Sequence, residues 1–357
     1  MFRRSSSDLG LKRAKWLTGT AVAAVAALSL AACSSSSSSS QSASSSTTSA
    51  KTYRIAFLAS SSQNGYNQAV YAGITAKAKA MGNVETTILD GQFKADLQLN
   101  QLEDAVATGK YDGIIIVPSD TVGIAAGMPS AKAKNIPVVT VLFPIGPDLK
   151  KLEPQVDGII STVASPPADG ATKQAQLVVD YCKKLNPCRV VVLIGQLQYP
   201  FDKVRYDAYR AVLDKEKNIK VVATASGNYD RDTSLKAMTD VIQANPKIDV
   251  VLSNADQQTE GAAIALKTAG FPDGKVYLTG GGGTKEAVAA VRAGQWAADY
   301  LNFPASMGSA ALEQIINSLT GKPVLAVVNG DNLGPLDPFV DKAQLDAHPE
   351  FTGEWSG

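Results

Sequence analysis

Short apolar runs alternate with amphipathic stretches along the chain from about residue 51. In the first half, apolar runs predict strands at 54–59, 84–89, 113–117 and 138–142. Apolar positions at helical spacing predict helices at 66–81, around Leu99, Leu102 and Val106, and at 122–134. Strands that alternate with helices in this way form a parallel sheet that is covered on both faces.

The same alternation restarts and predicts a second unit. The expected strands are 159–163, 190–194, 220–225, 250–252, 276–279 and 298–301. The expected helices are 168–184, 202–217, 231–245, 257–269, 284–293 and 304–320. The fold class is therefore α/β, with two doubly wound parallel-sheet domains. Such domains bind ligands beyond the carboxyl ends of their strands, so the cleft between them is the expected site.

The N-terminal residues carry a targeting signal. Basic residues precede an apolar stretch from Trp16 to Ala32 that stops at Cys33. Its Ala-rich core, 21–32, is shorter than the roughly 20 apolar residues that span a bilayer. Leu30-Ala31-Ala32-Cys33 resembles the lipobox of bacterial lipoproteins, which implies that Cys33 is lipidated. An ordinary signal peptide with a chance cysteine is the alternative, and both the general and the twin-arginine export routes stay open.

Residues 34–50 are nearly all Ser, Thr and Ala, so they bury little apolar surface and are expected to form a flexible tether.

The net charge of +1 argues against a nucleic-acid partner, which requires a basic face. In an exported protein, Cys182 and Cys188 are more consistent with a disulfide than with a metal site. The single histidine, His348, excludes histidine-rich zinc sites and leaves one candidate for a Ser-His-Asp triad.

A glycine run at 280–283 precedes Thr284 and Lys285. It lacks Gly-Lys-Ser/Thr, and it lacks the third glycine of a dinucleotide fingerprint, so we expect no nucleotide cofactor. A glycine-rich turn between a strand and a helix lets backbone approach a ligand. A tight turn without a ligand is the equally open alternative.

Several short motifs follow one another in a specific order over about residues 52–323. They are Asn64-Gly65-Tyr66 after the first strand, 135–140, Gly227 to Asp230, Asn254 to Asp256, and Asn302-Phe303-Pro304. Together they resemble the ribose-binding family of periplasmic sugar-binding proteins. The resemblance implies the type I periplasmic-binding-protein fold, in which a multi-strand hinge joins the two domains. The expected division is a signal peptide at 1–32, a tether at 33–51, an N-terminal domain at 52–162 with 303–328, and a C-terminal domain at 163–302 with 329–357.

The resemblance also implies roles for individual residues. Asn64 and Tyr66 would contact the ligand from the first domain, Arg205 would grip sugar hydroxyls, Tyr229 would stack on the ligand, and Asp256 would accept from hydroxyls. For Arg205, a salt bridge on a helix surface is the alternative. The expected ligand-binding residues are Gln63, Asn64, Tyr66, Asn67, Asp120, Phe143, Arg205, Tyr229, Asn254, Asp256 and Asn302.

The chain departs from the family where sugar binders carry an Asp-Arg pair and a Phe-Asp pair. Leu142-Phe143 and Gly281-Gly282 stand there instead. A buried polar ligand group without a partner costs about 1–3 kcal/mol. The ligand is therefore expected to have fewer hydroxyls than ribose or to use glutamines, which are Gln63, Gln198, Gln257 and Gln258.

These observations predict the substrate-binding lipoprotein of an ABC importer, which binds a small sugar or polyol in an interdomain cleft. It is expected to be anchored by lipid on the extracytoplasmic face of the bacterial membrane and to contact the permease subunits. We expect no enzymatic activity, no cofactor, no metal and no nucleic acid. A sensory receptor for a sugar-like signalling molecule is the alternative, because the physics of binding is the same.

Overall fold

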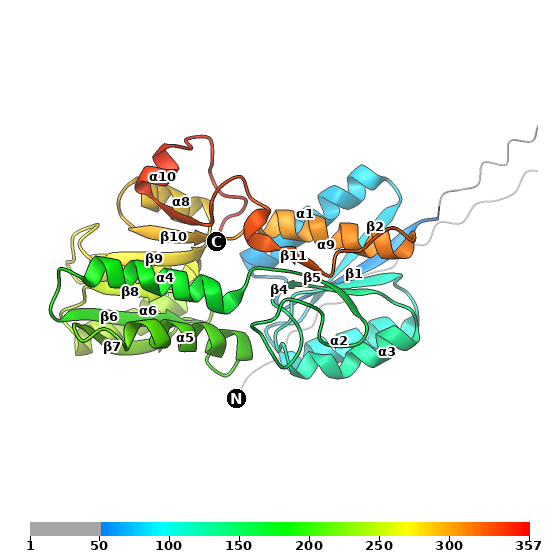
Figure 1. Ribbon diagram of the computed structural model, residues 1–357, viewed down its shortest axis with the longest axis horizontal. Helices are drawn as coiled ribbons and strands as arrows, with labels where there is room; N and C mark the ends of the chain where they lie inside the picture. The colour runs from blue at the N-terminus through cyan, green and yellow to red at the C-terminus, as the bar shows by residue number, and fades with distance from the viewer. Residues whose placement is uncertain (1–50) are drawn as a thin grey trace, which may run out of the picture. The chain divides into compact units, whose positions relative to one another are not determined.

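Two six-stranded sheets organise residues 51–357, the part of the chain that the structure, a computed structural model, describes (Figure 1). The first sheet contains β1 (Tyr53–Ala59), β2 (Val84–Asp90), β3 (Gly113–Ile116), β4 (Val138–Leu142), β5 (Ile159–Ala164) and β11 (Val327–Asn329). Its strand order is β11-β5-β4-β3-β1-β2, and all paired strands run parallel. We call this sheet and its helices the first lobe.

The second sheet has almost the same design. It contains β6 (Cys188–Ile194), β7 (Ile219–Ser226), β8 (Val250–Ser253), β9 (Tyr277–Gly282), β10 (Ala298–Leu301) and β12 (Phe339–Asp341). Its order is β12-β10-β9-β8-β6-β7, and only the β10–β12 pair is antiparallel. This sheet and its helices form the second lobe, and the predicted class of two doubly wound α/β units is confirmed.

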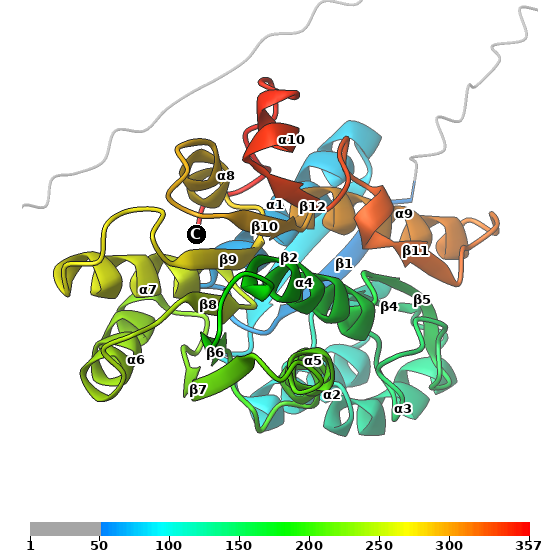
Figure 2. The same ribbon diagram turned by 60° about the vertical axis from the view of Figure 1, so that its left-hand side comes forward.

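The side chains of β1 show why the first sheet is covered on both faces. Ile55 and Phe57 point to a core under α1 (Gly65–Met81) and α9 (Pro304–Leu319), which lie side by side (Figures 1 and 2). Ala56 and Leu58 point to the opposite core, under α2 (Ala95–Thr108), the 3₁₀ helix η1 (Gly123–Gly127) and α3 (Met128–Ala133). Alternate residues of a strand face opposite sides, so a strand buried on both faces is apolar throughout.

The second lobe buries its sheet in the same way. One face packs against α4 (Pro167–Cys182) and α5 (Pro200–Leu213). The other packs against α6 (Arg231–Ala244), α7 (Asp256–Thr268), α8 (Lys285–Arg292) and α10 (Lys342–Asp346). The structure joins Cys182, at the end of α4, to Cys188, at the start of β6, with their Cα atoms 5.6 Å apart.

One expected element differs from the structure. The helix expected at 122–134 is divided into η1 and α3. A second short 3₁₀ helix, η2 (Gly330–Asn332), follows β11. Gly127 lies at the division, and Pro129 occupies the first turn of α3, where its missing N–H group needs no partner. Proline is tolerated there but would interrupt a continuous helix.

The chain passes from one sheet to the other three times: after β5, after β10, and between β11 and β12. Consequently α9 and β11 complete the first lobe although they follow the second lobe in sequence. Within residues 51–357, no helix has both the length and the apolar character that crossing a membrane requires. Cys33 and the segments predicted as signal peptide and tether up to residue 50 lie outside the described residues.

Candidate ligand-binding cleft

A cavity of about 100 Å³ is lined by residues of both lobes. Its first-lobe lining comes mainly from the loops after the parallel strands: Ser60, Asn64, Tyr66, Asn67, Phe93, Val117, Pro118, Ser119, Leu142 and Phe143. Loops at this edge of a doubly wound sheet form the usual ligand crevice. Facing them, the second lobe contributes residues that include Tyr199, Phe201, Arg205, Tyr229, Asn254, Gln257, Gly281, Gly282, Tyr300 and Asn302.

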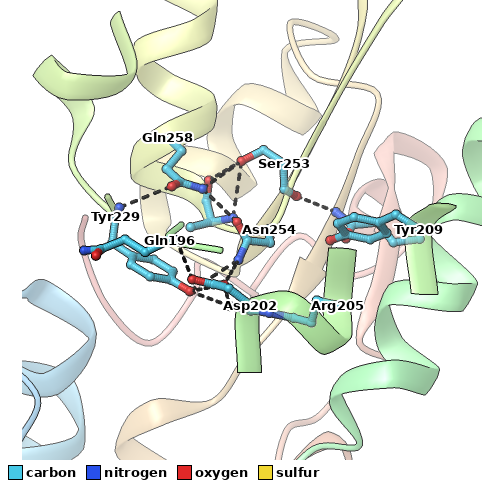
Figure 3. A network of polar contacts seen from close by, with 10 residues as sticks. Gln196, Asp202, Arg205, Tyr209, Tyr229, Ser253, Asn254 and Gln258 are labelled. Carbon is cyan, nitrogen blue, oxygen red and sulfur yellow. Dashed lines mark hydrogen bonds and ion pairs between the residues drawn. The ribbon is translucent and has the colours of Figure 1, made fainter. Parts of the chain in front are cut away.

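A buried carboxylate organises the second-lobe wall (Figure 3). Asp202 lies in the first turn of α5, where a negative charge is favoured by the helix dipole. Its Oδ1 accepts hydrogen bonds from Arg205 at 2.7 Å, from the Tyr229 hydroxyl at 2.5 Å and from the Asn254 amide at 2.9 Å. Its Oδ2 accepts from the backbone N–H of Gln196 at 2.6 Å. This carboxylate is therefore occupied by protein donors.

The same network fixes the charge states of its members. Burial raises the pKa of Tyr229 well above its ordinary value, although the nearby Arg205 opposes the shift. Burial acts to lower the pKa of Arg205, but Tyr229 and Asp202 outweigh it and raise that pKa above its ordinary value. Tyr229 is thus a neutral hydroxyl and Arg205 a cation near neutral pH. Their geometry presents a preformed surface to the cavity.

Aromatic rings form much of the remaining wall. Phe143 of the first lobe stacks on Phe201 of the second, with ring centroids 4.3 Å apart, and the Arg205 guanidinium lies 5.3 Å from the centroid of Phe143. Phe93 stacks on Tyr229 across the lobes at 6.4 Å. The Tyr199 hydroxyl also donates to the carbonyl oxygen of Phe93 at 2.7 Å. These contacts join the two lobes directly.

Some polar atoms in the lining have no protein partner. They are Arg205 Nε and the hydroxyl oxygens of Ser119 and Ser165, all of them buried. Buried polar atoms are nearly always hydrogen bonded, so these three atoms have hydrogen-bonding capacity that the protein itself does not use. Among the described residues that line the cavity, none is acidic, and Arg205 is the only charged one. Because Asp202 compensates that charge, the cleft is suited to a neutral ligand.

The structure brings many of the predicted site residues together. Those that line the cavity are Asn64, Tyr66, Asn67, Phe143, Arg205, Tyr229, Asn254 and Asn302. The side chain of Asn67 is already bonded to Ser60 and Asn64, which limits what it can offer to a ligand. For Arg205, the surface salt bridge considered from sequence is replaced by an ion pair with a fully buried aspartate.

Three predicted residues lie elsewhere, which corrects their sequence-based placement. Gln63 is exposed and donates to Ser62, while Asp120 accepts from the backbone N–H of Val122 at 2.9 Å. Asp256 is fully buried, and its Oδ2 accepts from the backbone N–H of Thr284 at 2.8 Å. Each of these side chains is used by its local backbone or faces solvent, so none lines the cavity.

Asp256 instead forms a carboxyl pair with Asp299 beneath the glycine-rich turn. Asp299 Oδ2 accepts from the backbone N–H of Gly283 at 3.1 Å, and the two Oδ1 atoms have no other partner. Burial raises the pKa of Asp299 well above its ordinary value, and the neighbouring Asp256 raises it further. Burial also raises the pKa of Asp256. The pair therefore holds a shared proton more tightly than ordinary carboxyls do.

Several lining residues were not expected from sequence. Tyr199 and Phe201 follow β6 at the start of α5, a position that their placement after a strand could have indicated. Phe93 follows β2 in the same way. Trp355 comes from a C-terminal segment without helical or strand periodicity, and no sequence signal pointed to it.

This fold, with a cavity enclosed by two parallel-sheet lobes, defines a two-domain binding protein. In agreement, the family described as "Periplasmic binding protein domain" matches residues 55–323, so the chain belongs to that family. More narrowly, it is a member of the ribose-binding family of type I periplasmic binding proteins.

Comparison with individual proteins supports this assignment. The ribose import binding protein of Bacillus subtilis is 26% identical over 279 residues, which are 78% of this chain and 86% of that protein. The D-allose-binding periplasmic protein of Escherichia coli is 30% identical over 252 residues, 69% and 78% of the two chains. A solved ABC transporter solute-binding protein from Mycobacterium smegmatis with bound glycerol has a TM-score of 0.71 and 25% identity, covering 83% of this chain and 96% of that one.

Proposed function

We propose that this chain is the substrate-binding protein of an ABC importer and that it holds a small neutral sugar or polyol between its lobes. The observation that carries the proposal is the cavity lined by both lobes, with free hydrogen-bonding atoms beside aromatic rings. A ligand that contacts both lobes stabilises the closed state over the open one. The closed form is what the membrane subunits of an importer would recognise.

The chemistry of the lining supports a sugar or polyol. Arg205 Nε and two serine hydroxyls can bond to ligand hydroxyls, and aromatic faces pack against C–H groups. A compensated charge gives no net attraction to an ion. The relatives named above are a ribose import binding protein and a D-allose-binding protein. The proposed role is binding without chemical conversion and without a cofactor.

We further propose that the protein is anchored by a lipid on Cys33 at the extracytoplasmic face of the membrane. The lipobox-like Leu30-Ala31-Ala32-Cys33 and the serine-rich segment after it support this location. The tether would allow the two lobes to reach the permease while staying near the membrane.

A thermal-shift screen of the purified protein against pentoses, hexoses and cyclic polyols tests the proposed ligand class. A sugar at about 100 times its Kd adds about 2.7 kcal/mol to the free energy of unfolding, which raises Tm clearly. At least one neutral sugar or polyol is expected to do so, while amino acids and dipeptides do not. A protein stabilised by amino acids, and by no sugar or polyol, would contradict the proposal.

A further inference from the structure

The C-terminal residues 351–357, which we call the strap, reach from the second lobe into the cleft wall. The strap lies beyond residue 323, where the family match ends. Its Trp355 carbonyl oxygen accepts from the backbone N–H of Lys285 at 2.8 Å, and the Trp355 Nε1–H donates to the carbonyl oxygen of Gly282 at 2.7 Å. These bonds attach the strap to the turn that joins β9 to α8.

The neighbouring residue attaches the strap to the first lobe. The Glu354 carboxylate accepts from the backbone N–H groups of Ala305 at 3.0 Å and Ser306 at 3.2 Å, and also from the Ser306 hydroxyl. Those N–H groups are at the beginning of α9, where they lack partners within the helix and a negative charge is favoured. Consecutive strap residues therefore hold different lobes, which fixes Trp355 between them.

Trp355 is only 4% exposed and is part of the cavity lining. Its ring packs edge-to-face against Tyr66 of the first lobe, with centroids 5.5 Å apart. On the other side, a Cβ atom at Gly282 would lie 2.9 Å from indole Cζ2. Asp256 Oδ2 would lie at the same distance from that Cβ atom, so glycine at this position makes room for both the indole and the Asp256 carboxylate.

The polar side-chain atoms of Trp355 and Tyr66 already have partners in the protein. The indole N–H is bonded to Gly282, and the Tyr66 hydroxyl donates to Met307 Sδ at 3.2 Å. Gly281 and Gly282 contribute no side chain. A ligand hydroxyl buried against the indole face would lose its hydrogen bonds to water without replacement by these residues, whereas a C–H or methyl group would lose none.

We propose that Trp355 is a ligand-contacting, specificity-determining residue, and that the strap selects neutral sugars that lack a hydroxyl where they face the indole. This inference rests on the proposed function, because it specifies the sugar class that the same cleft binds. Glu354 is a positioning residue, which acts by holding the strap on α9.

Tryptophan fluorescence tests the contact, because the described residues contain one other tryptophan, Trp296, which is buried but does not line the cleft. The probes are D-fucose with D-galactose, L-rhamnose with L-mannose, and 2-deoxy-D-ribose with D-ribose, which are three pairs differing by one hydroxyl. A bound probe is expected to change the emission of the wild type and of Trp296→Phe, and not that of Trp355→Phe. A change that persists in Trp355→Phe and is lost in Trp296→Phe would overturn the contact.

Calorimetric titration with the same pairs tests selection. The wild type is expected to bind the deoxy member of at least one pair about tenfold more tightly, which corresponds to about 1.4 kcal/mol. Trp355→Ala should remove that preference. If the alanine variant does not fold stably, Trp355→Phe, which keeps a ring, should retain only part of the preference. Glu354→Gln should weaken both members of a pair, since it loosens the strap.

The outcomes separate the two proposals. A wild type that binds none of the sugars or polyols refutes the proposed function. A wild type that binds them with no deoxy preference, or a Trp355→Ala variant that folds and keeps the preference, refutes the role of Trp355 and leaves the proposed function intact.

Discussion

Arg205 has two tasks at once, because it lines the cleft and compensates the buried charge of Asp202. Removing one partner of a buried ion pair costs about 3–5 kcal/mol, since it leaves an uncompensated charge. Arg205→Ala is therefore expected to lower the free energy of unfolding of the unliganded protein by about that amount and to weaken sugar binding. Urea unfolding and calorimetric titration measure the two effects separately.

Tyr229→Phe is the matched control for this prediction. It removes a hydroxyl that donates to Asp202 and accepts from Arg205 but leaves the ion pair in place, so it should cost less, about 1.5–3 kcal/mol of stability. It keeps the ring that stacks on Phe93 across the lobes. An Arg205→Ala variant as stable as the wild type would show that the buried Asp202 carboxylate does not depend on this partner.

The Asp256–Asp299 pair predicts a pH dependence of stability. Its pKa values are raised in the folded state, so the folded protein binds a proton more tightly than the unfolded chain. The pair's contribution is therefore greatest below the ordinary aspartate pKa of about 3.9 and is lost as pH rises toward the raised folded values. Asn at position 299 resembles the protonated acid and can keep the hydrogen bonds to Gly283 and Asp256.

Asp299→Asn is expected to raise the free energy of unfolding at about pH 7 and to reduce its decline between about pH 5 and pH 8. Urea unfolding across this range measures both. Glu260, whose pKa burial raises to about 7, contributes to the slope in wild type and variant alike. The surface substitution Asp273→Asn should leave the slope unchanged, and an equal slope in Asp299→Asn would argue against a shared proton.

At the scale of elements, the contact between α1 and α9 depends on two glycines. A Cβ atom at Gly73 would lie 1.8 Å from the carbonyl oxygen of Ala305, and one at Gly308 would lie 2.1 Å from that of Val70. Gly73→Ala must therefore separate the helices and is expected to cost about 3 kcal/mol, the upper end for overpacking. The exposed neighbour Ala72→Ser should change stability by less than about 0.5 kcal/mol. Equal unfolding midpoints for the two variants would disprove the tight contact.

Periodicity predicted most elements to within a few residues, because long helices and buried strands repeat their pattern. The strand at 298–301 and the helix beginning at Pro304 are examples. β11 and β12 were not predicted, since strands of three residues carry too little pattern. Their place in the sheets is decided by packing against neighbours that are distant in sequence.

The site was less predictable than the fold. Resemblance pointed to Arg205 and Tyr229, but their shared partner Asp202 was not recognised. The i,i+3 spacing of Asp202 and Arg205 within α5 was a signal for the ion pair, whereas the contact with Tyr229 depends on how α5 is placed against the loop after β7. Asp256 has the residue type of a ligand acceptor, yet its carboxylate already accepts a hydrogen bond from the backbone N–H of Thr284. Sequence indicates which groups a segment offers, whereas packing decides which of them remain free.

At the scale of the whole molecule, lipidation at Cys33 would determine where the protein acts. Cys33→Ala is expected to move it from the membrane fraction to the soluble fraction, because each buried CH₂ of a lipid chain contributes about 0.8 kcal/mol to membrane binding. Immunoblots of fractionated cells measure the distribution. The double variant Cys182→Ser/Cys188→Ser retains Cys33 and should stay with the membrane. An unchanged distribution of Cys33→Ala would refute the lipid anchor.

The three passages between the sheets also determine when each lobe can mature during synthesis. Met307, Ala311 and Leu312 of α9 complete the core on one face of the first sheet, and β11 supplies an edge strand. Until these residues have been synthesised, that face is uncovered and is a target for chaperones and proteases. The second sheet is likewise incomplete until its edge strand β12 has been synthesised. The N-terminal lobe is therefore synthesised first and finished late, so a nascent chain arrested before α9 should remain protease-sensitive in both halves.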